Sequence, residues 1–582
     1  MKKYILISLL MTFSPSLFAQ TWLWSKQSLQ SSDTYGVATD LQGNAYLTGP
    51  FGSSTHFGSY TFNSISSSND SYLLKYDSLG NIVWGAQSVS NSSSSATTVF
   101  NASDNYGNEY IVGFFNGTVR FGTFVLTSLN NDAFLVKYNV GGNVVWARQS
   151  SADDFHFWAL GESVATDKAG NIYITGRFED TIAFGSQKVV SDFTGSVGSV
   201  FLVKYDSAGN TLWARQSNVK TTAQGAWINS VCADDSGNAY ITGDFTDEIS
   251  FGTDTLKCYT YPWYGDMFLV KYNTNGNELW ARQSNAPSQL SCAVGNSVVA
   301  DKTGNVYLTG FFHDTMTLGS RTLISNSIGI YGDVFLSKFD KNGNVLWVEQ
   351  SVNTSLNNGW AGYSVALDTL NHLFMTAGAD EVGNGKIIFE KNIYTYTSSD
   401  PDPSLVMELD TSGNVLCSSF VGSGGDDFNT IAVSSSGKYV YWGGDMWTTI
   451  VLGKDTVFDL SPGPGGDEPP FIARWWPCTE NDTMPVLPNG IECNIFVPNA
   501  FSPNKDGWND ILYVRGDCIK TMDLVIHDRW GNKVFESTNI NYGWDGTYKN
   551  QAENTATFAY YLHASLQDGT VVDKKGNITL VR

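Results

Sequence analysis

Short runs in which apolar and polar residues alternate recur along most of the chain and predict β-strands. One stretch contains four such runs, at Ser163–Asp167, Asn171–Phe178, Val200–Asp206 and Asn210–Ser217. They are rich in β-branched and aromatic residues, as strands are. DKAGN and DSAGN separate them; Asp can accept backbone hydrogen bonds there and Gly supplies a positive φ, which is hairpin-turn chemistry. The pattern predicts four antiparallel strands.

This four-strand text is repeated at a regular interval. The phrase GNAYLTG begins at Gly43, and related phrases begin at Gly107, Gly170, Gly237, Gly304, Leu370 and Gly437. Successive starts differ by 64, 63, 67, 67, 66 and 67 residues. Seven repeats of four short strands predict an all-β chain that forms a seven-bladed β-propeller of four-stranded blades.

The first residues after the N-terminal leader contain a fourth strand without the three strands that precede it elsewhere. Thr21–Ser28 matches Asn143–Ser150, whereas the seventh repeat has a third strand at Phe471–Trp476 and no fourth. We therefore expect Thr21–Ser28 to complete blade seven and close the ring. Closure would remove an exposed sheet edge, which is an aggregation hazard.

The repeats resemble a bacterial family of β-propeller repeat proteins with SBBP-like repeats. The shared text is G-N-x-Y-[IL]-T-G, FLVKYD and G-N-x-x-W, and the resemblance covers about Thr21 to Cys478. It implies a propeller and no particular activity.

A different text follows the repeats. TENDTMPVLPNG at Thr479–Gly490 is typical of a linker, and Cys493 then opens CNIFVPNAFSPNKDGWND. Alternation in Thr557–Gly569 puts one set of apolar side chains on one face, and several short strands predict a small Ig-like β-sandwich. The members of that set are Phe558, Tyr560, Leu562 and Leu566.

This tail resembles the gliding-motility-associated C-terminal domain, the type B sorting signal of the type IX secretion system. FVPNAFSPN, DGWND, RWG and GWDG carry the resemblance, and Glu553–Thr557 departs from the Pro/Gly turn usual in the family. The resemblance implies a Bacteroidota source and passage through the periplasm. It also implies contact with the type IX machinery and delivery to the cell surface or the medium.

The N-terminus is typical of a secretory signal. Lys2 and Lys3 precede the apolar run Tyr4–Met11, and we expect cleavage after Ala19. No later stretch approaches the ~20 apolar residues of a membrane helix. The expected organisation is a signal peptide at 1–19, a propeller at 20–478, a linker at 479–490 and a sorting domain at 491–582.

The net charge of the chain limits the classes of partner that it can bind. The net charge is −22, with 56 acidic and 34 basic residues. Such a balance repels nucleic acid and anionic lipid, so we expect neither as a partner.

The seven cysteines are an odd number, so at least one has no intramolecular partner. Cys493 and Cys518 are the best candidates for a disulfide, and we expect Cys232, Cys258 and Cys292 to be small buried apolar residues.

Asn504, Asp506 and Asp510 have the alternating oxygen ligands of a calcium loop. No bidentate Glu follows at the expected spacing, so Asx-turns are favoured over calcium there. No other cofactor is predicted.

Two residue types recur once per repeat. Indoles can stack on sugars, but copies spread around a ring are better explained by packing between blades, so we expect that for Trp24, Trp84, Trp146, Trp213, Trp280 and Trp347. We expect the repeated lysines to point outward from an exposed strand face: Lys75, Lys137, Lys204, Lys271 and Lys338.

The sequence predicts no enzyme. Its six histidines fall singly. GESVA at Gly161–Ala165 resembles a nucleophile elbow only loosely, since no helix follows it. The Asp turns differ from sialidase Asp-boxes in spacing, and the clustered arginines of a sialidase are not evident.

The leading functional hypothesis is a binding or adhesion module. The least repetitive inserts, Phe178–Val200, Phe245–Asp266 and Phe312–Asp333, join second and third strands, where loop variation carries specificity. The best candidate contact surface for a carbohydrate or protein is Tyr259, Tyr261, Trp263 and Tyr264. Packing of these residues within the insert is equally open. The alternatives are a polysaccharide-acting enzyme in the channel and a passive structural or gliding-associated surface protein.

Overall fold

The structure is a computed structural model, and every element among its described residues is a strand. The described residues are 22–28, 32–65, 69–152, 158–191, 198–219, 225–259, 265–285, 291–325, 327, 332–354, 359–380, 384–397, 403–421, 429–445, 450–452, 455–457, 469–477, 497–498, 500–504, 511–514, 519–539, 542–549, 551–566 and 571–581. The chain divides into two compact units, Met1–Thr479 and Glu480–Arg582.

The first unit is built from sets of four antiparallel strands, and the described residues contain seven such sets. Three sets are separate four-stranded sheets, and four lie within larger sheets, which further strand pairings join. The first strands of the sheets are β2 (Gly36–Thr39), β8 (Ser95–Ser103), β13 (Ala159–Thr166), β19 (Ala226–Ala233), β25 (Cys292–Ala300), β31 (Gly359–Leu367) and β37 (Thr430–Val433). The second strands are β3 (Ala45–Phe51), β9 (Glu109–Phe121), β14 (Ile172–Phe178), β20 (Ala239–Phe245), β26 (Val306–His313), β32 (Leu373–Asp380) and β38 (Val440–Asp445).

The two outer strands of each sheet complete it. The third strands are β6 (Asp70–Tyr76), β10 (Phe124–Tyr138), β17 (Ser199–Tyr205), β23 (Asp266–Tyr272), β29 (Asp333–Phe339), β35 (Ser404–Leu409) and β41 (Pro470–Trp475). The fourth strands are β7 (Ile82–Ser90), β11 (Val144–Gln149), β18 (Thr211–Val219), β24 (Glu278–Gln283), β30 (Val345–Asn353), β36 (Val415–Val421) and, in the last sheet, β1 (Trp22–Gln27).

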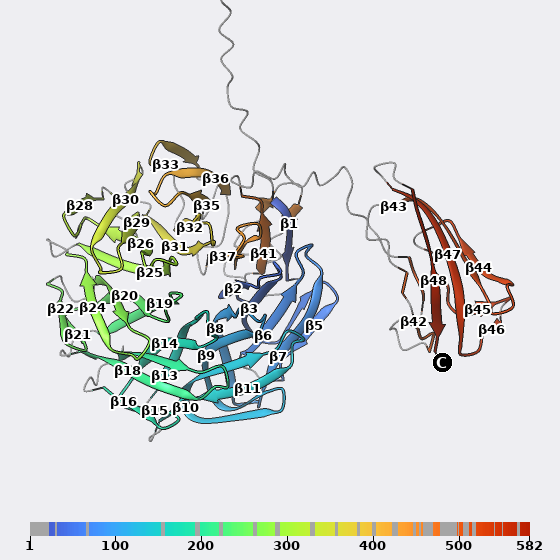
Figure 1. Ribbon diagram of the computed structural model, residues 1–582, viewed down its shortest axis with the longest axis horizontal. Helices are drawn as coiled ribbons and strands as arrows, with labels where there is room; N and C mark the ends of the chain where they lie inside the picture. Colours follow the sequence, from blue (N-terminus) through green and yellow to red (C-terminus); the bar gives the residue numbers. More distant parts are fainter. Residues whose placement is uncertain are drawn as a thin grey trace, which may run out of the picture. The chain divides into compact units, whose positions relative to one another are not determined.

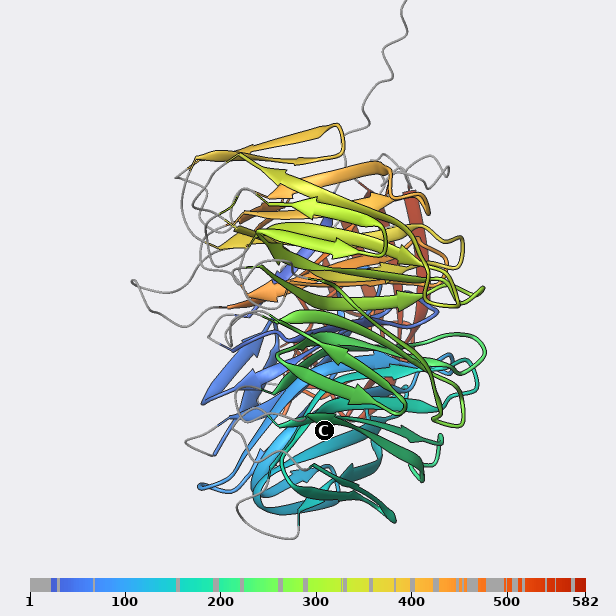
Figure 2. The ribbon, with the colours of Figure 1, turned by 90° about the vertical axis from the view of Figure 1, so that its left-hand side faces the viewer.

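These sheets are the blades of a β-propeller. Each first strand contacts the first strand of the next blade, and β37 contacts β2, so the first strands form a closed inner ring. Figure 1 shows the blades radiating from that ring, and Figure 2 shows their strands from the side. Blades are numbered below from blade 1 (β2, β3, β6, β7) to blade 7 (β37, β38, β41, β1).

The ring is closed by the two ends of the first unit. β1 pairs antiparallel with β41, with Trp22 opposite Trp475 and Ser25 opposite Ala473. Trp22 and Trp24 are buried, and the Trp22 ring lies 5.4 Å from that of Trp442. This is the pairing expected of Thr21–Ser28, of which Thr21 lies outside the described residues.

The inserts between second and third strands contain hairpins. They are β4–β5 (Ser54–Phe57, Tyr60–Asn63), β15–β16 (Thr181–Phe184, Gln187–Val190), β21–β22 (Glu248–Phe251, Asp254–Lys257), β27–β28 (Thr315–Leu318, Arg321–Ile324), β33–β34 (Gly385–Phe389, Asn392–Tyr396) and β39–β40 (Ile450–Leu452, Asp455–Val457). In blade 2, extensions of β9 and β10 form the equivalent hairpin.

Several hairpins pair with the fourth strand of the preceding blade. Ser217 in β18 lies opposite Phe251 in β21, and Ser351 in β30 lies opposite Phe389 in β33. The inserts expected to supply binding loops are therefore partly structural, because their hairpins link successive blades.

The second unit has its own core. β43 (Ile519–His527), β44 (Lys533–Ser537), β47 (Ala556–Leu566), β48 (Val571–Leu580) and the short β42 (Ala500–Phe501) form one sheet, and β45 (Thr547–Tyr548) pairs with β46 (Gln551–Ala552). An isolated bridge joins Leu512 to Trp544. Trp544, Phe558 and Leu562 are buried, as alternation predicts for the last two, and Tyr560 is half-buried.

Candidate functional site

The repeated Asp turns hold themselves together through one carboxylate. Asp167 accepts hydrogen bonds from the backbone N–H groups of Ala169 and Asn171, both at 2.9 Å. It also accepts from Asn171 Nδ2 at 2.7 Å and from the Tyr173 hydroxyl at 3.1 Å. The hairpin chemistry predicted for this sequence pattern is confirmed, and the carboxylates that provide it are fully engaged.

The repeated lysines are buried, so the prediction that they point outward is wrong. Lys204 Nζ lies 4.8 Å from the ring centre of Tyr173 and 3.7 Å from Asp167 Oδ2. It donates to Oγ1 and the carbonyl of Thr274 in the next blade, at 2.8 and 3.3 Å. The neighbouring blade and the turn give the ammonium contacts that replace part of its hydration, and burial still lowers the pKa of Lys204 against the opposing effect of Asp167. Lys75, Lys137 and Lys271 are also buried, and Lys338 is half-buried.

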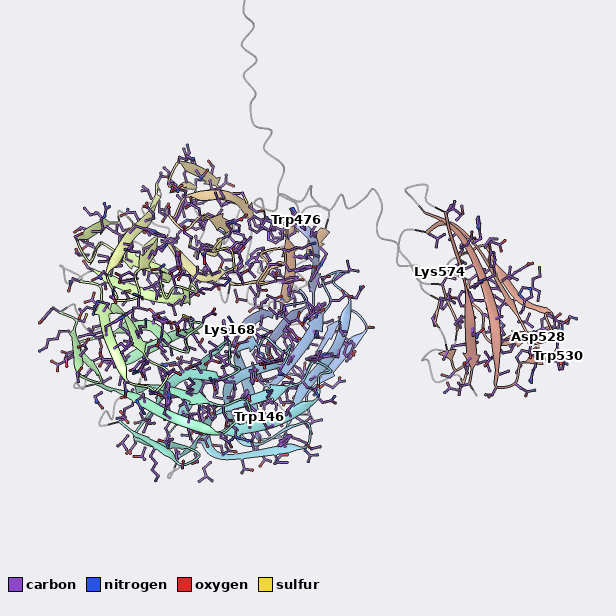
Figure 3. All side chains as sticks on the ribbon, in the orientation of Figure 1. Trp146, Lys168, Trp476, Asp528, Trp530 and Lys574 are labelled. Carbon is purple, nitrogen blue, oxygen red and sulfur yellow. The ribbon has the colours of Figure 1, made fainter. Side chains whose placement is uncertain are left out.

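The repeated tryptophans pack between blades, as predicted. Trp213 Nε1 donates to the Thr274 carbonyl at 3.0 Å, and Arg215 Nε donates to the Gly276 carbonyl at 2.6 Å. Trp146 makes the same contact with Ser207, and Figure 3 shows it within the ring. In the closing strand β1 of blade 7, Trp24 Nε1 donates to the Ser78 carbonyl of blade 1. The repeated text therefore encodes a joint between blades, not a ligand site.

Blade 6 replaces this joint with a different set of charges. Glu408 stands where blades 1 to 5 have Lys, Phe374 where they have Tyr, and His372 where their turn has Asn. His372 Nδ1 lies 2.9 Å from Asp368 Oδ2 and 3.9 Å from Glu408 Oε1. The residues at all three positions differ together in blade 6. The Asp368 turn therefore keeps its hydrogen bonds although the lysine is absent.

The strongest candidate site lies where the neighbouring blades 3 and 4 depart from the repeat near the inner ring. Arg177 follows the Thr-Gly pair of β14, and Asp244 holds the equivalent position in β20. Arg177 Nη2 lies 2.6 Å from Glu162 Oε1, and its Nε donates to the same oxygen at 2.7 Å. Glu162 sits at a β-bulge in β13, between Gly161 and Ser163. Bulges re-aim side chains and are common beside functional sites.

An aromatic and an amide side chain of blade 4 extend this polar group. Trp227 of β19 is directly opposite Asp244 in the strand register, so their side chains share one face of the sheet. Asn229 occupies the bulge equivalent to Glu162 and donates to the Gly295 carbonyl at 3.0 Å. Glu162, Arg177, Trp227, Asn229 and Asp244 are all half-buried. We call these five residues the inner-ring site.

The acids of the inner-ring site are electrostatically unusual. Burial raises the pKa of Asp244 to about 7, although the Arg177 charge opposes that shift. Burial also raises the pKa of Glu162, again against Arg177, which is its ion-pair partner. Within the part of the chain that the structure describes, no hydrogen bond to the Asp244 side chain is found. Raised pKa values combined with a specific charge partner are frequent at functional sites.

Sequence reasoning missed this site because each residue is ordinary by itself. GESVA resembles only a loose nucleophile elbow, and no motif singles out Arg177 or Asp244. One signal was present: the residue after the Thr-Gly pair changes from Phe114, in the equivalent position of blade 2, to Arg177, Asp244 and Phe311. Variation at a fixed point of a regular repeat marks a position that the fold does not dictate.

The insert aromatics are only partly described. Tyr259 is 82% exposed, whereas Tyr261, Trp263 and Tyr264 lie outside the described residues. The contact surface predicted there stays a prediction.

The calcium loop and the Cys493–Cys518 disulfide also remain predictions, because Asp506, Asp510 and both cysteines lie outside the described residues. The described residues contain no metal-binding group of three or more His, Cys, Asp or Glu. Asn504 donates its N–H to Ser502 at 2.8 Å. Cys258 and Cys292 are buried, as expected, whereas Cys232 is half-buried, and Cys417 is disulfide-bonded.

A groove of about 430 Å³ lies between blades 3 and 4, lined by side chains that include Lys188, Arg215, Gln216 and Glu278. Arg215 already bonds the next blade, and Glu278 accepts the Thr253 N–H at 2.8 Å. Because its charged groups serve the joint, we favour the inner-ring site over this groove.

Comparison with known proteins identifies the tail. Residues 495–580 match the CHU_C type IX secretion signal domain. An uncharacterized WD repeat-containing protein, L264 of Acanthamoeba polyphaga mimivirus, is 26% identical over 264 residues, which are 37% of this chain and 18% of that protein's length.

Solved structures are similar only distantly. Polysaccharide lyase Uly1 has a TM-score of 0.37 and 9% identity, covering 76% of this chain and 89% of the lyase. A protein of unknown function from Bacteroides caccae has a TM-score of 0.23 and 12% identity, covering 49% of this chain and 89% of that protein. The tail is a type IX secretion signal, and the protein is secreted or displayed at the cell surface. No helix among the described residues is long and apolar enough to cross a membrane.

Proposed function

We propose that the protein is a secreted or surface-displayed binding module whose propeller binds an extracellular carbohydrate at the inner-ring site. The observation that carries the proposal is the convergence of a half-buried Arg–Glu pair, a carboxylate without a described hydrogen-bond donor and an indole on neighbouring strands. Sugars need both planar apolar surface and directed polar groups, and binding sites combine these two features.

Exclusion of the other repeated residues supports this location. The turn aspartates, the lysines and the tryptophans of the joints are bonded within the ring, so few of their polar atoms are left for a ligand. At the inner-ring site the groups are half-buried and differ from blade to blade, as specificity requires.

The test is binding of the full chain to a polysaccharide and glycan array. Asp244→Asn and Trp227→Ala should each lower affinity for the best ligand by about tenfold or more, the effect of ~1.4 kcal/mol. Tyr259→Ser is the matched control, since it removes an exposed aromatic from the insert of the same blade. If Tyr259→Ser lowers binding and the other two changes do not, the insert binds the ligand and the inner-ring site does not.

The competing function is a polysaccharide-acting enzyme. The observation that favours it is the pKa of Asp244, raised to about 7, which would let this acid hold a proton near neutral pH. We propose binding without turnover, because Glu162 is occupied by Arg177. Product release from any polysaccharide, lost in Asp244→Asn, would favour the enzyme. Failure to bind or cleave any glycan would favour a protein ligand or a passive structural or gliding-associated role.

A further inference from the structure

We infer that Trp530, at the tip of the β43–β44 hairpin in the secretion signal domain, is a contact residue for a protein of the type IX machinery, which buries the indole in an apolar pocket. This inference concerns the tail and does not rest on the binding function proposed for the propeller. Figure 3 shows Asp528 and Trp530 at the end of that hairpin.

The turn that carries Trp530 is complete without its side chain. Asp528 accepts hydrogen bonds from the N–H groups of Trp530 and Asn532 and from Asn532 Nδ2, each at 2.8 Å. Gly531 supplies the positive φ, at 82°. This is the Asp turn of the propeller in a second, unrelated unit: the Asp206 turn has the same three bonds at 3.0, 2.8 and 2.8 Å.

The propeller turns show that the position of Trp530 needs no aromatic residue. Equivalent positions hold small, polar or aliphatic residues in most copies, including Gly141, Ala208, Asn275 and Ser412. A backbone N–H is all that the turn takes from this residue. The indole is therefore not explained by turn formation.

Packing within the domain does not explain the indole either. Trp530 is 80% exposed, whereas Trp544 in the same unit is 1% exposed. No ring contact involves Trp530 among the described residues, although Trp544 contacts Phe501 and Phe558. A Cβ on the adjacent Gly531 would meet nothing within 4 Å, so the turn stands clear of the rest of the domain.

One propeller turn also carries an aromatic residue, Tyr106, which is 69% exposed but lies close to the turn of the next blade. Tyr106 follows Asp104 at the same position, with its N–H 2.8 Å from the Asp104 carboxylate. Its Cε2 lies 3.5 Å from where a Cβ on Gly170 in the next blade would stand, so it approaches the neighbouring turn. Trp530 has no such neighbour among the described residues.

The chemistry of the tip fits a protein partner. Arg529 is exposed beside the indole, and Trp and Arg are the residues that dominate protein–protein binding energy when buried in a pocket. We expect the partner to present an apolar pocket with a carboxylate near its rim. The matched domain is a secretion signal, and a secretion signal must bind a component of the machinery that exports the protein.

The test is export of the full chain in a host with the type IX system. Trp530→Ala should lower the exported fraction by about tenfold and leave the protein in the periplasm, while Trp530→Phe should retain part of the export. Tyr106→Ala is the matched control and should be exported normally. The melting temperature of purified Trp530→Ala should equal that of the unmodified chain.

Each other outcome overturns the inference. Normal export of Trp530→Ala would show that the machinery does not use the indole. A lower melting temperature would show that the indole stabilises the fold. An equal export defect in Tyr106→Ala would show that loss of any exposed aromatic residue lowers the exported fraction. The location of the chain would then depend on retention by a carbohydrate and not on recognition of Trp530 by the machinery.

Discussion

At the scale of single residues, the charged side chains that recur between blades have hydrogen-bond partners far away in the sequence. Lys137 donates to Ser207 and Lys204 to Thr274, in both cases one blade further along. Alternation along one strand cannot reveal such a partner, which is why the sequence pattern wrongly predicts that the lysines face solvent. Turn chemistry could be predicted because Asp, Gly and Asn lie within five residues of one another.

Glu109 provides a pH test of the buried charges. It is fully buried and accepts hydrogen bonds from Asn101 Nδ2 at 2.7 Å and Ser103 Oγ at 2.5 Å. Burial raises its pKa to about 8, against a lowering by those two bonds. In the unfolded chain this carboxyl ionises near pH 4.5, whereas in the folded chain it stays protonated to a higher pH. Its contribution to stability is therefore fully present below about pH 4.5 and is lost as pH rises to about 8.

Glu109→Gln should flatten that dependence. The expected loss is at most ~1.4 kcal/mol per pH unit between the two pKa values, and the amide removes it while keeping a similar shape. Melting temperatures at pH 5 and pH 8 should thus differ less in the variant than in the unmodified chain. Glu179→Gln, at a half-buried glutamate, serves as control. An unchanged difference in Glu109→Gln would mean that Glu109 is ionised in the folded protein at neutral pH.

At the scale of elements, the strands of the blades could be predicted and the hairpins of the inserts could not. Thr181–Phe184 and Gln187–Val190 alternate as strands do, but a two-stranded hairpin is marginal by itself. What stabilises such hairpins is pairing with the preceding blade, as Ala183 does with Ser151. That partner belongs to another repeat, so the insert alone resembles a variable loop.

The closing strand yields a prediction at this scale. Deleting Trp22–Ser28 would expose the edge of β41 and remove the Trp22 contacts with Trp442 and with Ser419 Oγ, which accepts from Trp22 Nε1 at 3.0 Å. Each large buried side chain contributes ~2–3 kcal/mol. The deletion should therefore lower the melting temperature and promote association through the free edge. Lys26→Ser, an exposed change in the same strand, should do neither. A deleted protein that stays monomeric with the same melting temperature would contradict closure by β1.

At the scale of the whole molecule, fold and export rest on different residues. Most blades of the propeller repeat one joint, whereas the tail has a separate core around Trp544, Leu562 and Ile578. The role of the tail could be predicted from its sequence, because its motifs lie within one short segment and need no knowledge of the fold. The inner-ring site has no such motif, because it consists of single departures from a repeat that the packing of blade 3 against blade 4 brings together.

Separate cores predict that the propeller folds without the tail. The chain divides into its two compact units between Thr479 and Glu480, inside the Pro-containing segment expected to be a linker. Removing Cys493–Arg582 should leave a propeller with its melting transition intact, since domains with their own core fold alone. In a host with the type IX system, we expect this truncated protein to accumulate in the periplasm after its N-terminal signal has acted. Fractionation and immunoblotting of cells and medium measure that outcome.

The reciprocal experiment moves the tail to another protein. A reporter that carries the native N-terminal signal and residues 479–582 should reach the surface or medium, and it should remain periplasmic when the type IX machinery is disabled. Reporter export with the machinery disabled would mean that another route carries the chain outward. Normal export of the truncated propeller would show that residues outside the tail suffice for export. Neither result would alter the fold of the ring, because the pairing of β1 with β41 and the joints between blades involve no residue of the tail.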